Sequence, residues 1–276
     1  MTDIRPAWSE AFLDGDVAPA PPLVLPGVVT TDWAYGDGRG RGVRVAVVDS
    51  GIEADHPAVG GLAGAVEVLV DRDDGDAVTV VEGAHDDLYG HGTACAGLVR
   101  AVAADVELIS VRVLGAGLRG SADAFAGAVE WCIDHGVQVV NLSLSTSNVD
   151  YLPRFWALVD RAAFAGVVLV SAMSNERKRT IPSELAGVFS VAAGPGRDLE
   201  AVWCNPHGPA EWGAAGIDLE VAWKDGGWVV ASGNSFSAAV VTGHLARVLA
   251  AHPGLSPWQA RTVLAAVAVN ARRPGR

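Results

Sequence analysis

The fold is indicated first by residues 45–51, which read Val45-Ala46-Val47-Val48-Asp49-Ser50-Gly51. A short, continuous run of apolar and mostly β-branched residues is typical of a strand that is buried on both faces of a parallel sheet. The run stops at an aspartate that is followed by serine and glycine, and these residue types favour turns. We therefore predict a buried strand whose carboxyl end presents Asp49.

Apolar runs of this kind alternate with helical patterns along most of the chain. The predicted strands span residues 43–48, 106–113, 137–142, 167–172 and 188–193, and the predicted helices span residues 91–102, 121–135, 152–165, 235–251 and 256–269. This alternation favours a three-layer α/β fold, with a central, mostly parallel sheet and helices on both faces. Ligands bind such sheets beyond the carboxyl ends of the strands. Asp49, Ser143 and Asn175 all fall at predicted strand ends.

Length and composition favour one domain with a short extension. The 276 residues are enough for a single large core. Residues 1–30 contain Pro19, Pro21, Pro22 and Pro26 and predict an irregular N-terminal arm. We therefore expect the folded domain to span residues 31–276.

Charge and cysteine content narrow the choice of partners and compartment. The formal net charge of −12 argues against nucleic acids and anionic membranes as partners. No uninterrupted apolar run reaches the ~18 residues of a membrane span, and no secretory signal is recognised at the N-terminus. The three cysteines, Cys95, Cys132 and Cys204, are too few and too scattered for a disulfide framework. We expect a cytoplasmic protein, and the oligomeric state stays open.

Three short segments carry the chemistry of the chain. Asp49 ends a strand, His91 lies in Gly90-His91-Gly92-Thr93 at the start of a predicted helix, and Ser235 lies in Gly233-Asn234-Ser235-Phe236-Ser237 at the start of another. A serine nucleophile needs a hydroxyl, an imidazole that takes its proton, and a carboxylate that orients the imidazole. The three residue types therefore predict a hydrolytic catalytic triad.

The order of Asp49, His91 and Ser235 along the chain resembles the order of the triad residues in the subtilisin family of serine proteases. The resemblance extends from about Thr31 to about Val269, and it implies that residues 31–276 form a subtilisin-like catalytic domain. It also implies that Ser235 is the nucleophile, that His91 is the general base and that Asp49 orients His91. Asn175 falls where the family places its oxyanion-hole asparagine, with the Ser235 backbone N–H as the second donor.

The resemblance also implies a cleft that binds peptide or protein substrates. Leu118-Arg119-Gly120 and Ser143-Leu144-Ser145 align with two edge segments that hold the substrate backbone as an added strand. Met173 and Ser174 replace the family's usual Ala-Gly, and Ser145 replaces a glycine, so we expect a narrower S1 pocket.

Arg119 and the run Arg177-Lys178-Arg179 favour an acidic substrate. The alternative is that these residues form a solvated basic loop without a role in substrate binding.

No metal or cofactor is predicted. Residues 71–76, Asp71-Arg72-Asp73-Asp74-Gly75-Asp76, resemble the start of an EF-hand, but the glycine comes one position early and no glutamate follows at the required distance. The segment from Gly97 to Val106 is short for the calcium loop of many secreted relatives. Cys95 lies four residues after His91 on the same helix face, where small-residue packing is expected rather than catalysis.

The functional hypothesis is therefore a serine endopeptidase, and the cellular role that we expect is processing of a dedicated intracellular peptide. Two alternatives stay open from the sequence. The acyl-enzyme could react with an amine, which would make the protein a peptide ligase or macrocyclase. The cleft could instead hold a peptide without cleaving it, which would make the protein a binding module.

Overall fold

The computed structural model describes residues 25–71 and 77–271. Its helices are α2 (Thr31–Tyr35), α3 (His91–Val102), α4 (Ala122–Asp134), the 3₁₀ turn η1 (Val149–Tyr151), α5 (Leu152–Phe164), α6 (Asn234–Ala251) and α7 (Pro257–Val267). Its strands are β1 (Arg44–Asp49), β2 (Gly64–Asp71), β3 (Ala77–Glu82), β4 (Glu107–Arg112), β5 (Val139–Leu142), β6 (Val168–Ala172), β7 (Phe189–Ala193), β8 (Trp203–Cys204), β9 (Trp212–Ala214), β10 (Leu219–Trp223) and β11 (Gly227–Ala231).

Within residues 25–71 and 77–271, nine strands form one sheet, in the order β3-β2-β4-β1-β5-β6-β7-β9-β8. The pairs from β2 through β9 are parallel, and only the outermost strands β3 and β8 pair antiparallel with their neighbours. Strand β1 lies between β4 and β5. Strands β2 to β4 are added on one side of β1 and the later strands on the other, so the direction in which the sheet grows reverses at β1. In a parallel sheet such a switch point opens a crevice at the carboxyl ends of the strands.

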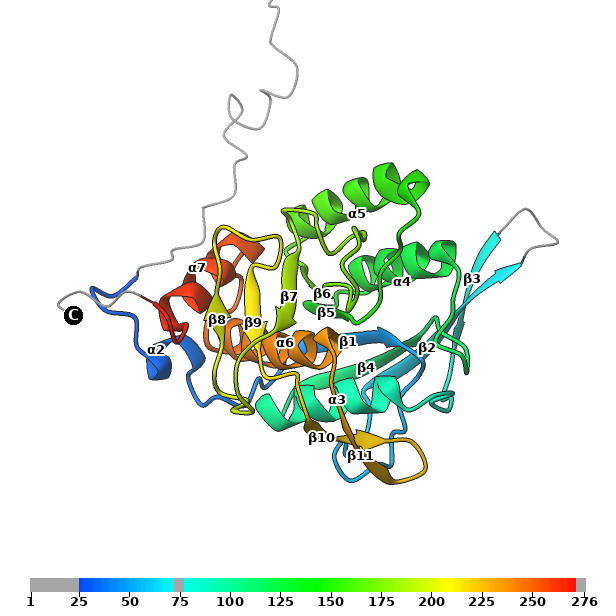
Figure 1. Ribbon diagram of the computed structural model, residues 1–276, viewed down its shortest axis with the longest axis horizontal. Coiled ribbons are helices and arrows are strands. Elements are labelled where there is room, and N and C mark those ends of the chain that lie inside the picture. The colour runs from blue at the N-terminus through cyan, green and yellow to red at the C-terminus, as the bar shows by residue number, and fades with distance from the viewer. Residues whose placement is uncertain (1–24, 72–76, 272–276) are drawn as a thin grey trace, which may run out of the picture.

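Helices cover both faces of the sheet, with α3 and α6 on one face and α4 and α5 on the other (Figure 1). The core is accordingly divided into two clusters. Val45 and Val47 of β1 belong to the cluster under α3 and α6, whereas Ala46 and Val48 belong to the cluster under α4 and α5. All four side chains are fully buried. This explains why β1 is apolar at every position from Val45 to Val48 rather than at alternate positions.

The strands and helices predicted from periodicity are confirmed to within a few residues at each end. Helix α7 shows why one boundary was readable. The Ser256 side chain accepts from the Gln259 backbone N–H, the Gln259 side chain accepts from the Ser256 N–H, and Pro257 occupies the first turn. A capping box with proline at the first helical position satisfies donors that a helix start leaves unpaired.

The predicted three-layer α/β fold is thus confirmed, while several peripheral elements were not predicted. Strand β3 is mostly exposed, and β8 and β9 are only two and three residues long. Such strands lack the continuous apolar run that marks a central strand. Of the acidic segment 71–76, residues 72–76 lie outside the described residues, as do residues 1–24 of the predicted arm; the boundary at residue 31 stays a prediction.

Candidate active site

The carboxyl end of β1 and the first turn of α3 place Asp49 against His91. Both Asp49 oxygens lie at hydrogen-bond distance from His91 Nδ1, at 2.9 and 2.8 Å. Asp49 is fully buried, and its Oδ1 also accepts from the Ser50 backbone N–H at 2.8 Å. This close approach needs Gly92, because a Cβ there would lie 2.0 Å from the Gly51 carbonyl oxygen. The Nδ1–H is committed to Asp49, which leaves Nε2 as the basic nitrogen.

Two opposing effects act on the pKa of His91. Burial lowers it, but the charge and hydrogen bond of Asp49 and the charge of Asp87 outweigh burial, so the net pKa is raised above 6.5. A raised pKa means that the imidazolium is stabilised where a proton has to be accepted. This is the property expected of a general base that takes the proton of a nucleophile.

Ser235 lies in the first turn of α6, directly after Gly233 and Asn234. Its side chain is nearly buried, and its Oγ donates to the Ser143 carbonyl at 3.3 Å. Among the described residues no hydrogen bond joins Ser235 Oγ to His91. Catalytic hydrogen bonds often form only in the complex with substrate. Because Ser235 lies in the first turn of α6, negative charge beside it is stabilised by the helix dipole.

Asn175 follows β6 and is exposed at the mouth of the site. Its Oδ1 accepts from the Asn234 backbone N–H at 3.0 Å. The amide nitrogen then lies beside Gly233, 3.8 Å from where a Cβ would stand. An amide held by its oxygen presents its N–H groups on the opposite side, so the arrangement suits a donor to an oxyanion.

A cleft of about 510 Å³ brings most of the predicted site residues together. Its lining includes His91, Ser235 and Asn175, and both predicted substrate segments, Leu118-Arg119-Gly120 and Ser143-Leu144-Ser145. The first segment turns tightly, with Leu118 at φ 52° and a hydrogen bond from Gly115 N–H to the Arg119 carbonyl at 3.0 Å.

Met173 and Ser174 are half-buried, and they do not belong to that lining. Their carbonyl oxygens accept from the Asn234 side chain at 3.1 Å each. The predicted narrowing of the S1 pocket by these side chains therefore stays a prediction. This backbone has a hydrogen-bond partner in Asn234, the first residue of α6.

Two of the three basic residues in the run Arg177-Lys178-Arg179 form ion pairs, which the sequence did not indicate. Lys178 pairs with Glu176 at 3.1 Å, and Arg179 pairs with Glu184 at 2.9 Å. For Arg177 and for the cleft residue Arg119, no ion pair is found among the described residues. Two of the four cations are thus compensated locally.

Sequence reasoning missed Asp87, which joins Ser50, directly after β1, to the start of α3. This buried carboxylate accepts from Ser50 Oγ, the Tyr89 and Gly90 backbone N–H groups, and both the N–H and hydroxyl of Thr93, at 2.6 to 3.0 Å. It therefore caps the start of α3 and fastens it to the end of β1. The available signal was an acid four residues before the histidine, where a helix N-terminus favours negative charge.

Two other buried side chains have structural roles. His56 is fully buried, with Nε2 at 2.9 Å from the Gly227 carbonyl and Nδ1 accepting from the Ala58 N–H at 3.1 Å. Cys95 is also fully buried, and burial raises the pKa of its thiol well above the ordinary value. A thiol held in the protonated form is a poor nucleophile. Cys95 therefore packs behind His91, as the sequence analysis expected.

Within the described residues, one group of side chains has metal-ligand spacing. Asp49, His91 and Cys95 offer ligand atoms within 4.8 Å of one another. The first two already bind each other, so an ion there would occupy the base of the triad.

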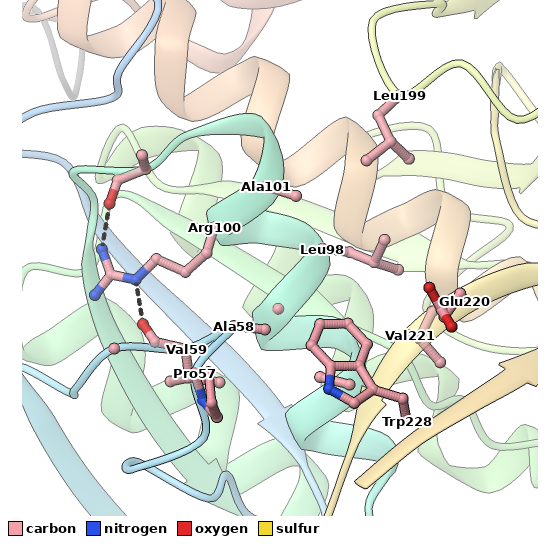
Figure 2. Close-up of a pocket in the computed structure, with 14 residues that line it drawn as sticks. Pro57, Ala58, Val59, Leu98, Arg100, Ala101, Leu199, Glu220, Val221 and Trp228 are labelled. Carbon is pink, nitrogen blue, oxygen red and sulfur yellow. Dashed lines mark hydrogen bonds between the residues drawn. The ribbon is translucent and has the colours of Figure 1, made fainter. Parts of the chain in front are cut away.

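A second hollow of about 490 Å³ lies between α3, the loop after His56 and the hairpin β10–β11 (Figure 2). It shares no lining residue with the catalytic cleft. Leu98, Val221 and Trp228 supply much of its apolar wall. The Arg100 guanidinium at its edge donates to four backbone carbonyls, those of Val59, Gly61, Ala104 and Val106. Arg100 therefore fastens loops rather than offering a charge to a ligand.

Comparison with known proteins agrees with this geometry. The profile of the Subtilase family matches residues 40–202, which include Asp49 and His91 but end before Ser235. A thermostable alkaline protease of Halalkalibacterium halodurans is 31% identical over 247 residues, covering 84% of this chain and 64% of that protein. Subtilisin DY of Bacillus licheniformis is 28% identical, covering 84% of this chain and 85% of that protein.

The fold agrees as well. The crystal structure of a cold-adapted subtilisin-like serine proteinase superposes with a TM-score of 0.64 at 24% identity, covering 83% of this chain and 89% of the other. The architecture is therefore the subtilisin-like fold. The chain belongs to the subtilase family.

Proposed function

We propose that the protein is a serine endopeptidase that acts through an acyl-enzyme. The observation that carries the proposal is the buried Asp49–His91 pair in the same cleft as Ser235, at the switch point of a parallel sheet. Subtilisin-like relatives of similar sequence support the same reaction class. The chain spans 64% of the length of the first of these relatives.

In this mechanism Ser235 Oγ turns from the Ser143 carbonyl toward His91. Oγ attacks the carbonyl carbon of the scissile bond while His91 Nε2 takes its proton. The oxyanion accepts from Asn175 Nδ2 and from the Ser235 backbone N–H. His91 then gives the proton to the leaving amine as the C–N bond breaks. A water molecule, deprotonated by His91, attacks the acyl-enzyme, and His91 returns this proton to Ser235 Oγ as the ester bond breaks and the acid leaves. Asp49 keeps the Nδ1 proton and stabilises the imidazolium throughout.

An active-site-directed fluorophosphonate tests the nucleophile. We expect the wild type to be labelled, Ser235→Ala to be unlabelled, and the matched control Ser232→Ala to be labelled like the wild type. Ser232 is an exposed serine three residues earlier, and its Oγ accepts a hydrogen bond from the Asp218 backbone N–H.

Internal cleavage of a mixed peptide library, read by mass spectrometry, tests endopeptidase activity. Joined peptides on addition of an amine would favour the ligase, and peptide binding without labelling would favour the binding module.

The substrate that we propose is an acidic peptide. Arg119 lines the cleft, and Arg177 lies just after Asn175; neither has an ion-pair partner among the described residues. Cations at a cleft raise the association rate of anionic ligands, and salt screens this effect. We expect acidic peptides to be cleaved faster than basic ones, with a ratio that falls as salt rises. Arg119→Gln should reduce the ratio, with the ion-paired Arg179→Gln as control; equal cleavage of basic peptides would remove the cations from recognition.

The cellular role that we propose is processing of a dedicated intracellular peptide. All three cysteines lie within the described residues and are unpaired, two of them buried, which is compatible with a reducing compartment. Among the described helices, none has both the length and the apolarity needed to cross a membrane. Cell fractionation with an antibody to the protein tests the location, and recovery in the culture medium would refute it.

A further inference from the structure

The residue before the nucleophile, Asn234, uses every polar group of its side chain. Its Nδ2 donates to the Met173 and Ser174 carbonyls at 3.1 Å each, and its Oδ1 accepts from the Ala193 backbone N–H at 2.8 Å. The backbone N–H of the same residue donates to Asn175 Oδ1 at 3.0 Å. One residue thus joins the segment after β6, the end of β7 and the start of α6.

This set of contacts needs a primary amide. A side-chain amide offers two N–H donors and a carbonyl acceptor, all directed away from one planar group. A threonine at this position would offer a single hydroxyl, which can donate only one proton and therefore cannot bind both carbonyls. The two carbonyl contacts thus depend on the side-chain amide of Asn234.

The residue held by these contacts is one that needs holding. Asn175 is exposed, and an exposed amide side chain samples several rotamers in water. The Asn234 side chain fixes the backbone ahead of Asn175 by donating to the Met173 and Ser174 carbonyls. The Asn234 backbone N–H fixes the Asn175 side chain by donating to its Oδ1. An oxyanion donor lowers the barrier only when it is oriented before charge develops.

We propose that Asn234 is a positioning residue that holds Asn175 in the orientation required of an oxyanion donor. The inference rests on the proposed function, because it assigns a cause to the orientation of that site. Asn234 does not itself touch the reacting atoms in this role. Its effect reaches the transition state through Asn175, so it should appear in kcat rather than in substrate binding.

The decisive variant is Asn234→Asp, which preserves shape and the acceptor for Ala193 N–H. It replaces the two N–H donors by a charged oxygen facing the Met173 and Ser174 carbonyls. We expect kcat for a peptide substrate to fall about 100-fold, comparable to loss of one oxyanion donor, with KM changed less than about threefold. Asn234→Thr, which retains one donor, should lose less. It also carries the test if the aspartate variant does not fold, as judged by circular dichroism.

The matched control is Asn205→Asp. Asn205 Nδ2 also donates to a backbone carbonyl, that of Ala210 at 3.0 Å, but it lies in the turn between β8 and β9. The same chemical change at this position should leave kcat within about twofold of the wild type. A loss equal to that of Asn234→Asp would mean that the effect is a general one of disturbed loops, and it would overturn the inference.

A double-mutant cycle identifies the route of the effect. If Asn234 acts through Asn175, then Asn234→Asp should cost less than about threefold in kcat once Asn175→Ala is present. Losses that multiply would show that Asn234 acts independently and would overturn the inference while leaving the proposed function intact. A wild type that is neither labelled by fluorophosphonate nor active on peptides would overturn the proposed function, and this inference with it.

Discussion

Replacement of Asp87 by asparagine tests the network that holds the catalytic pair. The Asp87 carboxylate is buried and accepts five hydrogen bonds, three at Oδ1 and two at Oδ2. Asparagine preserves the shape but can accept at one oxygen only. The least costly orientation keeps the three donors at Oδ1 and turns the new NH₂ group toward Thr93.

The magnitude follows from what the NH₂ group leaves unpaired. The Thr93 hydroxyl can turn and accept from it, but the Thr93 backbone N–H loses its acceptor, and a buried unsatisfied donor costs about 1–3 kcal/mol. The three remaining hydrogen bonds become neutral and lose several tenths of a kcal/mol each. Because the buried charge also disappears, part of this cost is offset. We expect the free energy of unfolding to fall by about 2–4 kcal/mol.

The same change should shift the pH dependence of activity. The charge of Asp87 contributes to the raised pKa of His91. Activity requires neutral His91, so kcat/KM falls as pH drops through this pKa. Without the charge of Asp87, the pKa decreases and the acid limb of the profile should move to lower pH.

Urea unfolding followed by circular dichroism measures the stability change, in a Ser235→Ala background that prevents self-cleavage. The control is Asp86→Asn, the same substitution at the exposed neighbouring carboxylate, which we expect to change stability by less than about 0.5 kcal/mol. A change below about 1 kcal/mol for Asp87→Asn, or an acid limb that moves to higher pH, would refute the argument that Asp87 fastens α3 to β1 and raises the pKa of His91.

Three further predictions follow from the site and the core. Ser235→Ala, His91→Ala and Asp49→Ala should each lower kcat by about 10⁴-fold or more, and the triple variant should lose little beyond the worst single one, because the groups act as a unit. Losses in peptide hydrolysis that multiply would contradict this. EDTA should leave activity and Tm nearly unchanged, whereas a fall of several degrees that calcium reverses would reveal a metal site. Burial lowers the pKa of His244 to about 4 in the folded protein. Because this histidine binds a proton more readily in the unfolded chain, the free energy of unfolding should fall as the pH drops from 6.5 toward 4. This group contributes at most about 1.4 kcal/mol per pH unit, and His244→Gln should flatten the slope in urea unfolding between these pH values.

The amino-acid sequence alone predicted the architecture, which the structure confirms, and it pointed to Asp49, His91 and Ser235 as the candidate triad. The continuous apolar run of β1 and the other predicted strands reflect burial on both faces of the sheet, a property that each residue carries wherever its partners lie. The three motifs with Asp49, His91 and Ser235 were legible for a similar reason. Each depends on a local geometry, a strand end or a helix start, that its own neighbours encode.

Exposed and short strands were not predicted from the sequence, because their stability comes from pairing with a neighbouring strand rather than from their own residues. Strand β3 is largely exposed and is held by its ladder with β2. The basic run after Asn175 shows the same limit, since its compensation by Glu184 depends on how the loop folds back.

Only the tertiary structure decided which polar side chains support the site. Asp87 accepts from Ser50, 37 residues earlier in the chain, and the Asn234 side chain binds carbonyls 60 and 61 residues away. Periodicity reports how deeply a residue is buried, but it does not report which donor meets which acceptor across the sheet edge. Those pairings arise because the parallel strands bring their carboxyl ends to one edge, where buried polar groups must find partners or lose free energy of hydration.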